Sequence, residues 1–178
     1  AAGEAFDKVA RVLGLPYPGG PELEKLALEG DPMKYPFHSA LNQSAEEADF
    51  SFSGIKTAVV NLMHNAAQKG EEISRADIAA SFQRAVCDTL TLKAVHAAKE
   101  HGFGTLALAG GVSANRALRS SLAQSCEGQG IRFCCPDFRY CTDNAAMIAC
   151  AGHYALMAGQ LSGLDLNAAP DLPLAREF

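Results

Sequence analysis

The 178-residue sequence predicts a helix-rich α/β fold from three observations. Apolar residues make up 48% of the chain, alanine is frequent and Trp is absent, a composition that suits packed helices. Two short apolar runs, 105–109 and 131–135, have the length and composition of strands. A helical pattern lies between them, and a strand–helix–strand order is typical of a parallel pair.

Helical periodicity accounts for most of the remaining chain. The first helix is expected to end at Gly14, before a rigid turn over 15–21 that contains three prolines and two glycines. Pro21 suits the first turn of the second helix, and Ser74 with Asp77 resembles a capping box. The expected helices cover 1–13, 21–29, 54–69, 75–100, 114–125 and 143–157.

Three stretches lack helical periodicity. Residues 30–48 are irregular, 50–53 look like a short extended piece, and 161–178 form a tail. Because the chain starts inside a helical pattern, and two strands alone cannot cover their faces and edges, the sequence predicts a piece of a longer protein. Further strands are expected before Ala1.

The net charge and the hydropathy of the sequence argue against general nucleic-acid binding and against a membrane span. The formal net charge of −5 gives no general attraction to nucleic acid, so any RNA contact needs a local basic patch. The candidates for such a patch are Arg116, Arg119, Arg132 and Arg139. No window approaches a membrane-spanning apolar run and no signal-peptide pattern opens the chain, so we expect a cytoplasmic location.

The six cysteines do not form a recognisable zinc or disulfide pattern. No C-x-x-C pair or H-E-x-x-H motif is present, and a metal cluster on Cys134, Cys135 and Cys141 lacks zinc-site spacing. Reduced thiols are the expected state.

The segment from Leu106 to Arg119 carries the strongest local signal. It is expected to form a buried strand, a diglycine turn at 110–111 and a helix that opens between Ser113 and Asn115. Open α/β sheets bind nucleotides at such turns, where the helix N–H groups face the ligand. The glycine spacing matches neither the dinucleotide fingerprint nor the Walker A loop, so a turn that serves packing alone stays open as an alternative.

Five motifs stand in order along the chain: Ala1–Lys8, Tyr17–Pro21, Phe52–Thr57, Gly110–Arg116 and Cys141–Ile148. Together they resemble the C-terminal half of the tRNA threonylcarbamoyladenosine transferase (TsaD) family. This resemblance implies most of the second lobe of an actin-like, sugar-kinase-like ATPase fold, with the first lobe and the first strands of this lobe absent. The family transfers a threonylcarbamoyl group from threonylcarbamoyl-adenylate to N6 of adenosine 37 in tRNAs that read codons beginning with A.

The resemblance also implies roles for five residues. Asp7 and Glu24 are expected to contact the ribose hydroxyls of the adenylate, Gly20 to line the pocket, and Asn115 to face the adenine and ribose. Asp143 is expected to be one ligand of a divalent metal, iron by resemblance, with zinc or magnesium also possible. From the residues alone, Asp7 and Glu24 could be surface carboxylates, and Asp143 could cap the last helix. No role is predicted for Phe52–Thr57 beyond packing.

The expected site is incomplete in this chain. The family's two other metal ligands, histidines in an H-x-x-x-H helix, and its glycine-rich phosphate segment have no match here. We therefore expect little or no activity from these 178 residues alone. The implied partners are tRNA, the adenylate, and proteins of the TsaB and TsaE kinds. The alternatives are a sugar or acetate kinase of the same fold, the metallopeptidase once named for this family, and a docking module without activity.

Overall fold

The computed structural model describes residues 1–37 and 49–168 of the chain. These residues belong to two compact units, Ala1–Thr142 and Asp143–Phe178. The parts of the sequence predictions that fall on 38–48 and 169–178 lie outside the described residues. The helices of the first unit are α1 (Ala2–Val12), α2 (Gly19–Ala27), α3 (Ser53–Lys69), α4 (Arg75–Glu100) and α5 (Arg116–Glu127).

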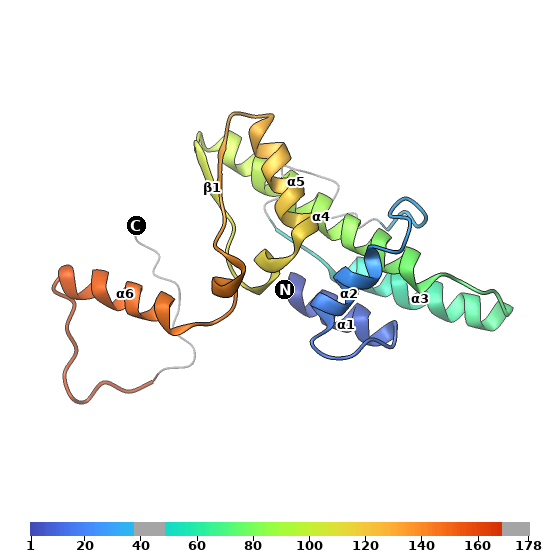
Figure 1. The fold of residues 1–178 in the computed structure, drawn as a ribbon, viewed down its shortest axis with the longest axis horizontal. Coiled ribbons are helices and arrows are strands. Elements are labelled where there is room, and N and C mark those ends of the chain that lie inside the picture. Colours follow the sequence, from blue (N-terminus) through green and yellow to red (C-terminus); the bar gives the residue numbers. More distant parts are fainter. Residues whose placement is uncertain (38–48, 169–178) are drawn as a thin grey trace. The chain divides into compact units, whose positions relative to one another are not determined.

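Helix α4 is the central element of the first unit. It contacts α1, α2, α3, α5 and the first strand, and its length is visible in Figure 1. The Ser74 hydroxyl accepts a hydrogen bond from the Asp77 backbone N–H at 3.1 Å, which confirms the predicted cap at its N-terminus. Phe82 is fully buried and meets the ring of Phe6 edge-to-face, with ring centroids 5.2 Å apart. This apolar packing fixes the positions of the helices that carry the site described below.

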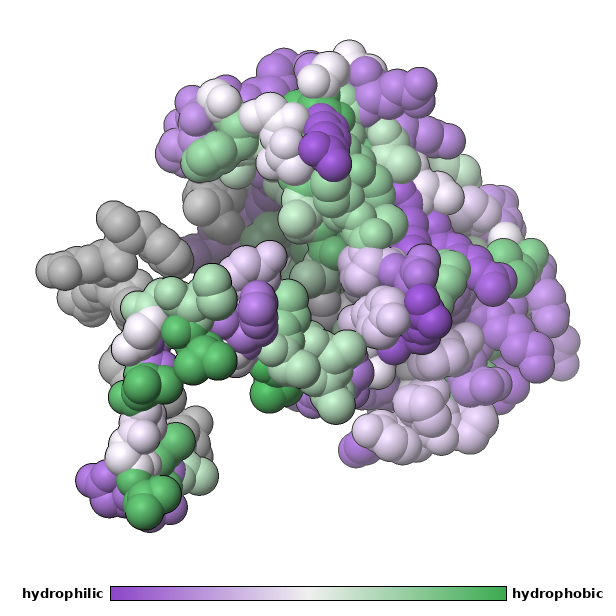
Figure 2. Space-filling view, turned by 60° about the vertical axis from the view of Figure 1, so that its left-hand side comes forward, coloured by the Kyte–Doolittle hydropathy of each residue, from purple (hydrophilic) through white to green (hydrophobic). Residues whose placement is uncertain are grey.

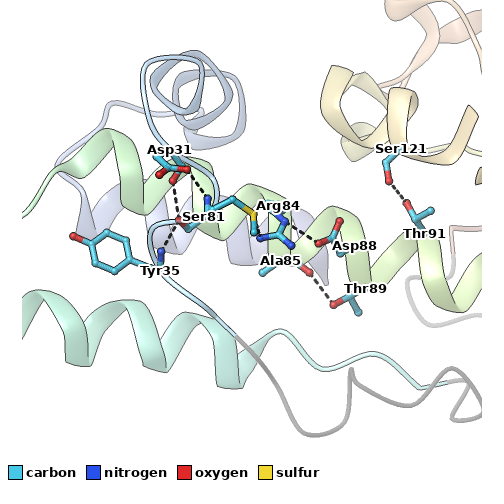
Figure 3. Close-up of polar contacts among 10 residues, drawn as sticks. Asp31, Tyr35, Ser81, Arg84, Ala85, Asp88, Thr89, Thr91 and Ser121 are labelled. Atoms are coloured by element: carbon cyan, nitrogen blue, oxygen red, sulfur yellow. Dashed lines mark hydrogen bonds and ion pairs between the residues drawn. The ribbon is translucent and has the colours of Figure 1, made fainter. Parts of the chain in front are cut away.

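Polar side chains on α4 hold the chain that follows α2 and the middle of α5 (Figure 3). The Ser81 hydroxyl donates to the Asp31 carbonyl at 3.2 Å and accepts from the Tyr35 N–H at 3.1 Å. Farther along α4, the hydroxyls of Thr91 and Ser121 lie 2.8 Å apart and link α4 to α5. These bonds add geometric specificity to the apolar contacts, because each partner is fixed by direction as well as by distance.

Strands β1 (Thr105–Ala107) and β2 (Arg132–Cys134) form a two-stranded parallel sheet, as predicted. Thr105 pairs with Arg132 and Ala107 with Cys134, and α5 connects the two strands. The strands are shorter than predicted, and the prediction of a buried first strand is wrong: β1 is exposed or half-buried along its length. Within the described part of the chain the sheet has no third strand, so much of its surface stays uncovered.

Several helix boundaries differ from the predictions by one or two residues. Helix α2 begins at Gly19 rather than at Pro21. Pro21 still fits in the first turn, because the N–H groups of a first turn have no partner within the helix and proline lacks only this group. The predicted extended piece at 50–53 contains no strand. Phe52 already has helical backbone angles, and Ser53 begins α3. The diglycine turn leads into a 3₁₀ turn, η2 (Gly111–Ala114), and α5 begins after it.

The second unit contains helix α6 (Ala145–Met157), none of whose residues is buried. Apolar side chains such as Ile148, Tyr154 and Met157 are more than 65% exposed, and Figure 2 shows strongly hydrophobic residues on the surface of this unit. In the part of the chain that the structure describes, no helix combines the length and apolar character that a membrane span requires.

Candidate functional site

The first unit contains a cavity of about 620 Å³ that collects residues from distant parts of the sequence. Its lining comes from α1, the turn before α2, α2 itself, η2 and Thr142. Asp7, Gly20, Glu24 and Asn115 all belong to this lining. The prediction that these four residues converge on one concavity is therefore confirmed, although about a hundred residues separate Asp7 from Asn115.

Asp7 is half-buried on α1 and joins this helix to the next one. Its Oδ1 accepts a hydrogen bond from the backbone N–H of Gly19 at 2.9 Å. Gly19 opens α2, where the N–H groups have no partner within the helix and the dipole favours negative charge. A Cβ on Gly19 would lie 2.6 Å from the Ala10 Cβ, so the close approach of α1 and α2 depends on this glycine.

Glu24 plays the same part at the N-terminus of α5. Its Oε1 accepts from the backbone N–H of Arg116, the first residue of that helix, at 2.7 Å. The bond joins residues 92 positions apart in the sequence, so it ties α2 directly to the diglycine segment. Each of the two carboxylates thus uses one oxygen to hold a helix N-terminus, and its second oxygen supplies further lone pairs at the cavity wall.

Asn115 is buried and fixed in orientation by three neighbours. Its Oδ1 accepts from the Leu118 N–H at 2.8 Å, which caps α5, and it lies 3.8 Å from the Cys87 sulfur. Its Nδ2 donates to Oε1 of Gln83 on α4 at 2.8 Å. An amide nitrogen carries two hydrogens, so one N–H remains that a ligand in the cavity could engage.

Gly20 gives the cavity wall bare backbone, and Gly110 shapes the turn that leads to the lining residue Gly111. Gly110 has φ +84°, a conformation that L side chains rarely adopt, so the turn requires glycine. A Cβ on Gly20 would meet no atom within 4 Å, so the protein's own packing does not require glycine there. A glycine with open space above it, in a cavity wall, is compatible with a ligand that approaches the backbone closely.

Sequence reasoning missed several lining residues. Tyr17 and Pro18 belong to the Tyr17–Pro21 motif, in which the sequence predicts a binding role for Gly20 alone, and Tyr17 is 87% exposed. Phe6 and Val112 add apolar surface on which a flat ring could pack. Gln83 could not have been found from spacing, because its partner lies 32 residues away on another helix.

Cys87 lies behind Asn115 and is not a reactive thiol. Burial, with smaller contributions from the charges of Asp88 and Glu24, raises the pKa of the Cys87 thiol to about 12. A thiol with this pKa stays protonated at neutral pH and makes a poor nucleophile or metal ligand. All six cysteines are free in the structure.

The described residues do not make a complete metal site. Among residues 1–37 and 49–168, no group of three or more His, Cys, Asp or Glu side chains is arranged to hold a metal ion. Asp143 is exposed at the start of the second unit, and a single carboxylate holds a divalent ion poorly. The capping alternative for Asp143 is wrong: α6 begins at Ala145, and Asn144 caps it by accepting from the Met147 N–H at 3.0 Å.

Comparisons with known proteins match nearly the whole chain. The family model of tRNA N6-adenosine threonylcarbamoyltransferase (TsaD) matches residues 1–150. Curated proteins of that name are 55% identical over 174 residues in Moorella thermoacetica and 53% identical over 175 residues in Geobacillus thermodenitrificans. A third, from Caldicellulosiruptor saccharolyticus, is 50% identical over 174 residues. Each alignment covers 98% of this chain and 51% of the relative, so the chain spans about half the length of the curated relatives it matches.

Proposed function

The chain belongs to the tRNA N6-adenosine threonylcarbamoyltransferase family, and from this premise we propose that the protein containing it modifies tRNA. The reaction is transfer of a threonylcarbamoyl group from threonylcarbamoyl-adenylate to N6 of adenosine 37 in tRNAs that read codons beginning with A. The observation that carries the proposal is the convergence of Asp7, Gly20, Glu24 and Asn115 on one cavity.

The chemistry of the cavity suits an adenylate. Ribose hydroxyls donate hydrogen bonds, and the carboxylates of Asp7 and Glu24 accept them strongly. The second amide N–H of Asn115 has no acceptor among the described residues, and it suits a ring nitrogen or a ribose oxygen. Gly20 offers backbone without a side chain, which lets a sugar lie close to α2. A cavity of about 620 Å³ is of the size that holds a nucleotide-sized ligand.

The other half of the site is proposed to come from residues outside those described. Asp143 supplies one ligand of a divalent metal, iron by family resemblance, and the remaining ligands come from another part of the complete protein. The chain forms most of the second lobe of an actin-like, sugar-kinase-like fold. Partner proteins of the TsaB and TsaE kinds and a cytoplasmic location belong to the same proposal. No observation in the described part of the chain favours the kinase, metallopeptidase or docking-module alternatives.

A single methyl group tests the proposal in the full-length protein. Gly20→Ala adds a Cβ that meets no protein atom within 4 Å, so folding is expected to be unchanged. Affinity for adenosine monophosphate, measured by calorimetry, is expected to fall about tenfold or more, because the methyl group occupies space proposed for the ribose. Threonylcarbamoyl transfer to tRNA falls with it.

Gly104→Ala is the matched control. A Cβ there also meets nothing within 4 Å, and Gly104 lies outside the cavity lining. Wild-type nucleotide affinity and transfer are expected for this variant. Wild-type affinity and transfer for Gly20→Ala as well would contradict the proposed site.

A further inference from the structure

Aromatic rings and arginine side chains are stacked together near the end of the first unit. The guanidinium carbon of Arg119 lies 4.0 Å from the ring centroid of Phe138, and that of Arg116 lies 5.7 Å from the same ring. The guanidinium of Arg139 lies 4.6 Å from the ring centroid of Tyr140. We call these five residues the arginine–aromatic surface. It includes three of the four arginines that the sequence marked as RNA-contact candidates.

Arg119 fixes this surface to the rest of the unit. Its Nε donates to the Ser113 carbonyl in η2, and its Nη2 donates to the Pro136 carbonyl at 2.7 Å and contacts the Cys141 sulfur at 3.1 Å. The segment that carries the aromatic rings is therefore held beside the diglycine turn. The rings stay accessible nonetheless: Phe138 is 52% and Tyr140 42% exposed.

The arginine–aromatic surface adjoins the cavity. Arg116 directly follows Asn115, and Thr142, two residues after Tyr140, also lines the cavity. An RNA whose adenosine N6 reaches the cavity must bring the neighbouring nucleotides to its rim. The surface lies where those nucleotides would arrive.

The arginine–aromatic surface is positively charged, whereas the chain as a whole is negatively charged. The whole chain carries a formal charge of −5, whereas this surface contributes three arginines. The nearby acid Asp137 lies 3.6 Å from the Arg139 Nη2, but both side chains are more than 70% exposed, so the ion pair is weak and a phosphate can compete for the guanidinium. Exposed rings interleaved with guanidinium groups are the chemistry on which unpaired RNA bases stack.

Resting on the proposed function, we propose that the arginine–aromatic surface binds the unpaired nucleotides that flank the target adenosine of the RNA substrate. Phe138 and Tyr140 stack on bases, and Arg116 and Arg139 contact phosphates. An RNA loop fits this surface better than a protein partner, because the bases and phosphates of adjoining nucleotides match the alternation of rings and guanidinium groups.

The test measures affinity of the full-length protein for an anticodon stem–loop RNA. Phe138→Leu keeps apolar bulk but removes the π face, and affinity is expected to fall about tenfold, whereas Phe138→Trp restores it. Arg139→Ala is expected to lower the slope of log affinity against log salt by about one. The matched control is Arg132→Ala, an exposed arginine on β2 outside this surface, which should bind RNA as the wild type does.

Adenosine monophosphate affinity separates this inference from the proposed function. It is expected to be unchanged in the variants at Phe138 and Arg139, since neither residue lines the cavity. If the wild-type protein does not bind adenosine monophosphate at all, the proposed function is contradicted instead. Wild-type RNA affinity for Phe138→Leu, or an equal loss for Arg132→Ala, would overturn the RNA surface. So would variants that keep RNA binding but lose a partner protein, because the surface would then be a protein interface.

Discussion

Helices α4 and α6 place their apolar residues in opposite environments. In α4, thirteen of 26 residues are buried, and they include polar side chains such as Gln83 and Ser81 that bond to neighbouring segments. In α6, no residue is buried, although its sequence is strongly apolar. The difference shows that the hydrophobicity of a residue alone does not determine whether it is buried, because burial also requires a neighbouring element.

The same difference separates the proposed ligand residues. Asp7, Glu24 and Asn115 belong to the first unit, and each accepts a hydrogen bond from a named backbone N–H. Asp143 belongs to the second unit and is exposed. The first unit therefore holds the residues that we propose bind a nucleotide in fixed positions, whereas the proposed metal ligand depends on groups outside the described residues.

The largest effect is expected at Asp143. In the full-length protein, Asp143→Ala and Asp143→Asn should both abolish measurable threonylcarbamoyl transfer and lower the bound metal content, because each removes the carboxylate proposed as a ligand. Thermal unfolding should not change, since Asn144 provides the helix cap. Asp165→Ala, which removes another exposed carboxylate of this unit, is the control and should keep activity. Near-normal transfer by Asp143→Asn would require withdrawal of the metal assignment.

A pair of core and surface variants tests the packing contrast. Phe82→Ala removes a fully buried ring from α4 and should lower the free energy of unfolding by about 3–5 kcal/mol. Ile148→Ala on α6 should change it by less than about 0.5 kcal/mol, because this side chain is 68% exposed. Urea unfolding measures the free energy of unfolding of both variants. Equal losses would show that α6 packs against another element in the complete protein.

Asn115 combines a structural and a binding role that two variants can separate. Asn115→Ala loses the α5 cap and the bond to Gln83, so stability should fall by about 1–3 kcal/mol and adenosine monophosphate affinity should fall as well. Asn115→Asp keeps an oxygen that can accept the Leu118 N–H, so the α5 cap stays, but it loses the N–H that Gln83 accepts. Stability should therefore fall less than for Asn115→Ala, while nucleotide affinity falls. If Asn115→Asp binds nucleotide normally, the amide N–H has no part in recognition.

The smallest effect at neutral pH concerns Cys87. Burial raises the pKa of this thiol to about 12, above the ordinary value of 9.0 that it regains on unfolding. Between these two values the unfolded chain releases a proton that the folded chain retains, so this residue lowers the stability of the folded protein as pH rises from 9 to 12. Iodoacetamide labelling followed by mass spectrometry should modify the exposed Cys135 and Cys150 long before Cys87. Equal labelling rates would contradict the buried environment.

Local sequence rules were accurate where one segment decides its own conformation. The period of apolar residues located the helices, and Ser74 marked the start of α4 because a hydroxyl at that position bonds the free N–H of Asp77. The same rules failed at Asp143, because both Asp143 and Asn144 can cap a helix and local chemistry does not choose between them. They also overestimated burial of β1, since burial depends on what else packs against a strand.

The sequence by itself determined the helix-rich α/β class, the parallel strand pair and, through its ordered motifs, the family. The tertiary structure decided which carboxylate oxygen holds which helix, and that Gln83 orients Asn115. It also decided that the side chains of Arg116 and Arg119 from α5 lie against the ring of Phe138. The physical reason is that a motif reflects short-range backbone requirements, whereas these contacts join residues that come together once the helices pack around α4.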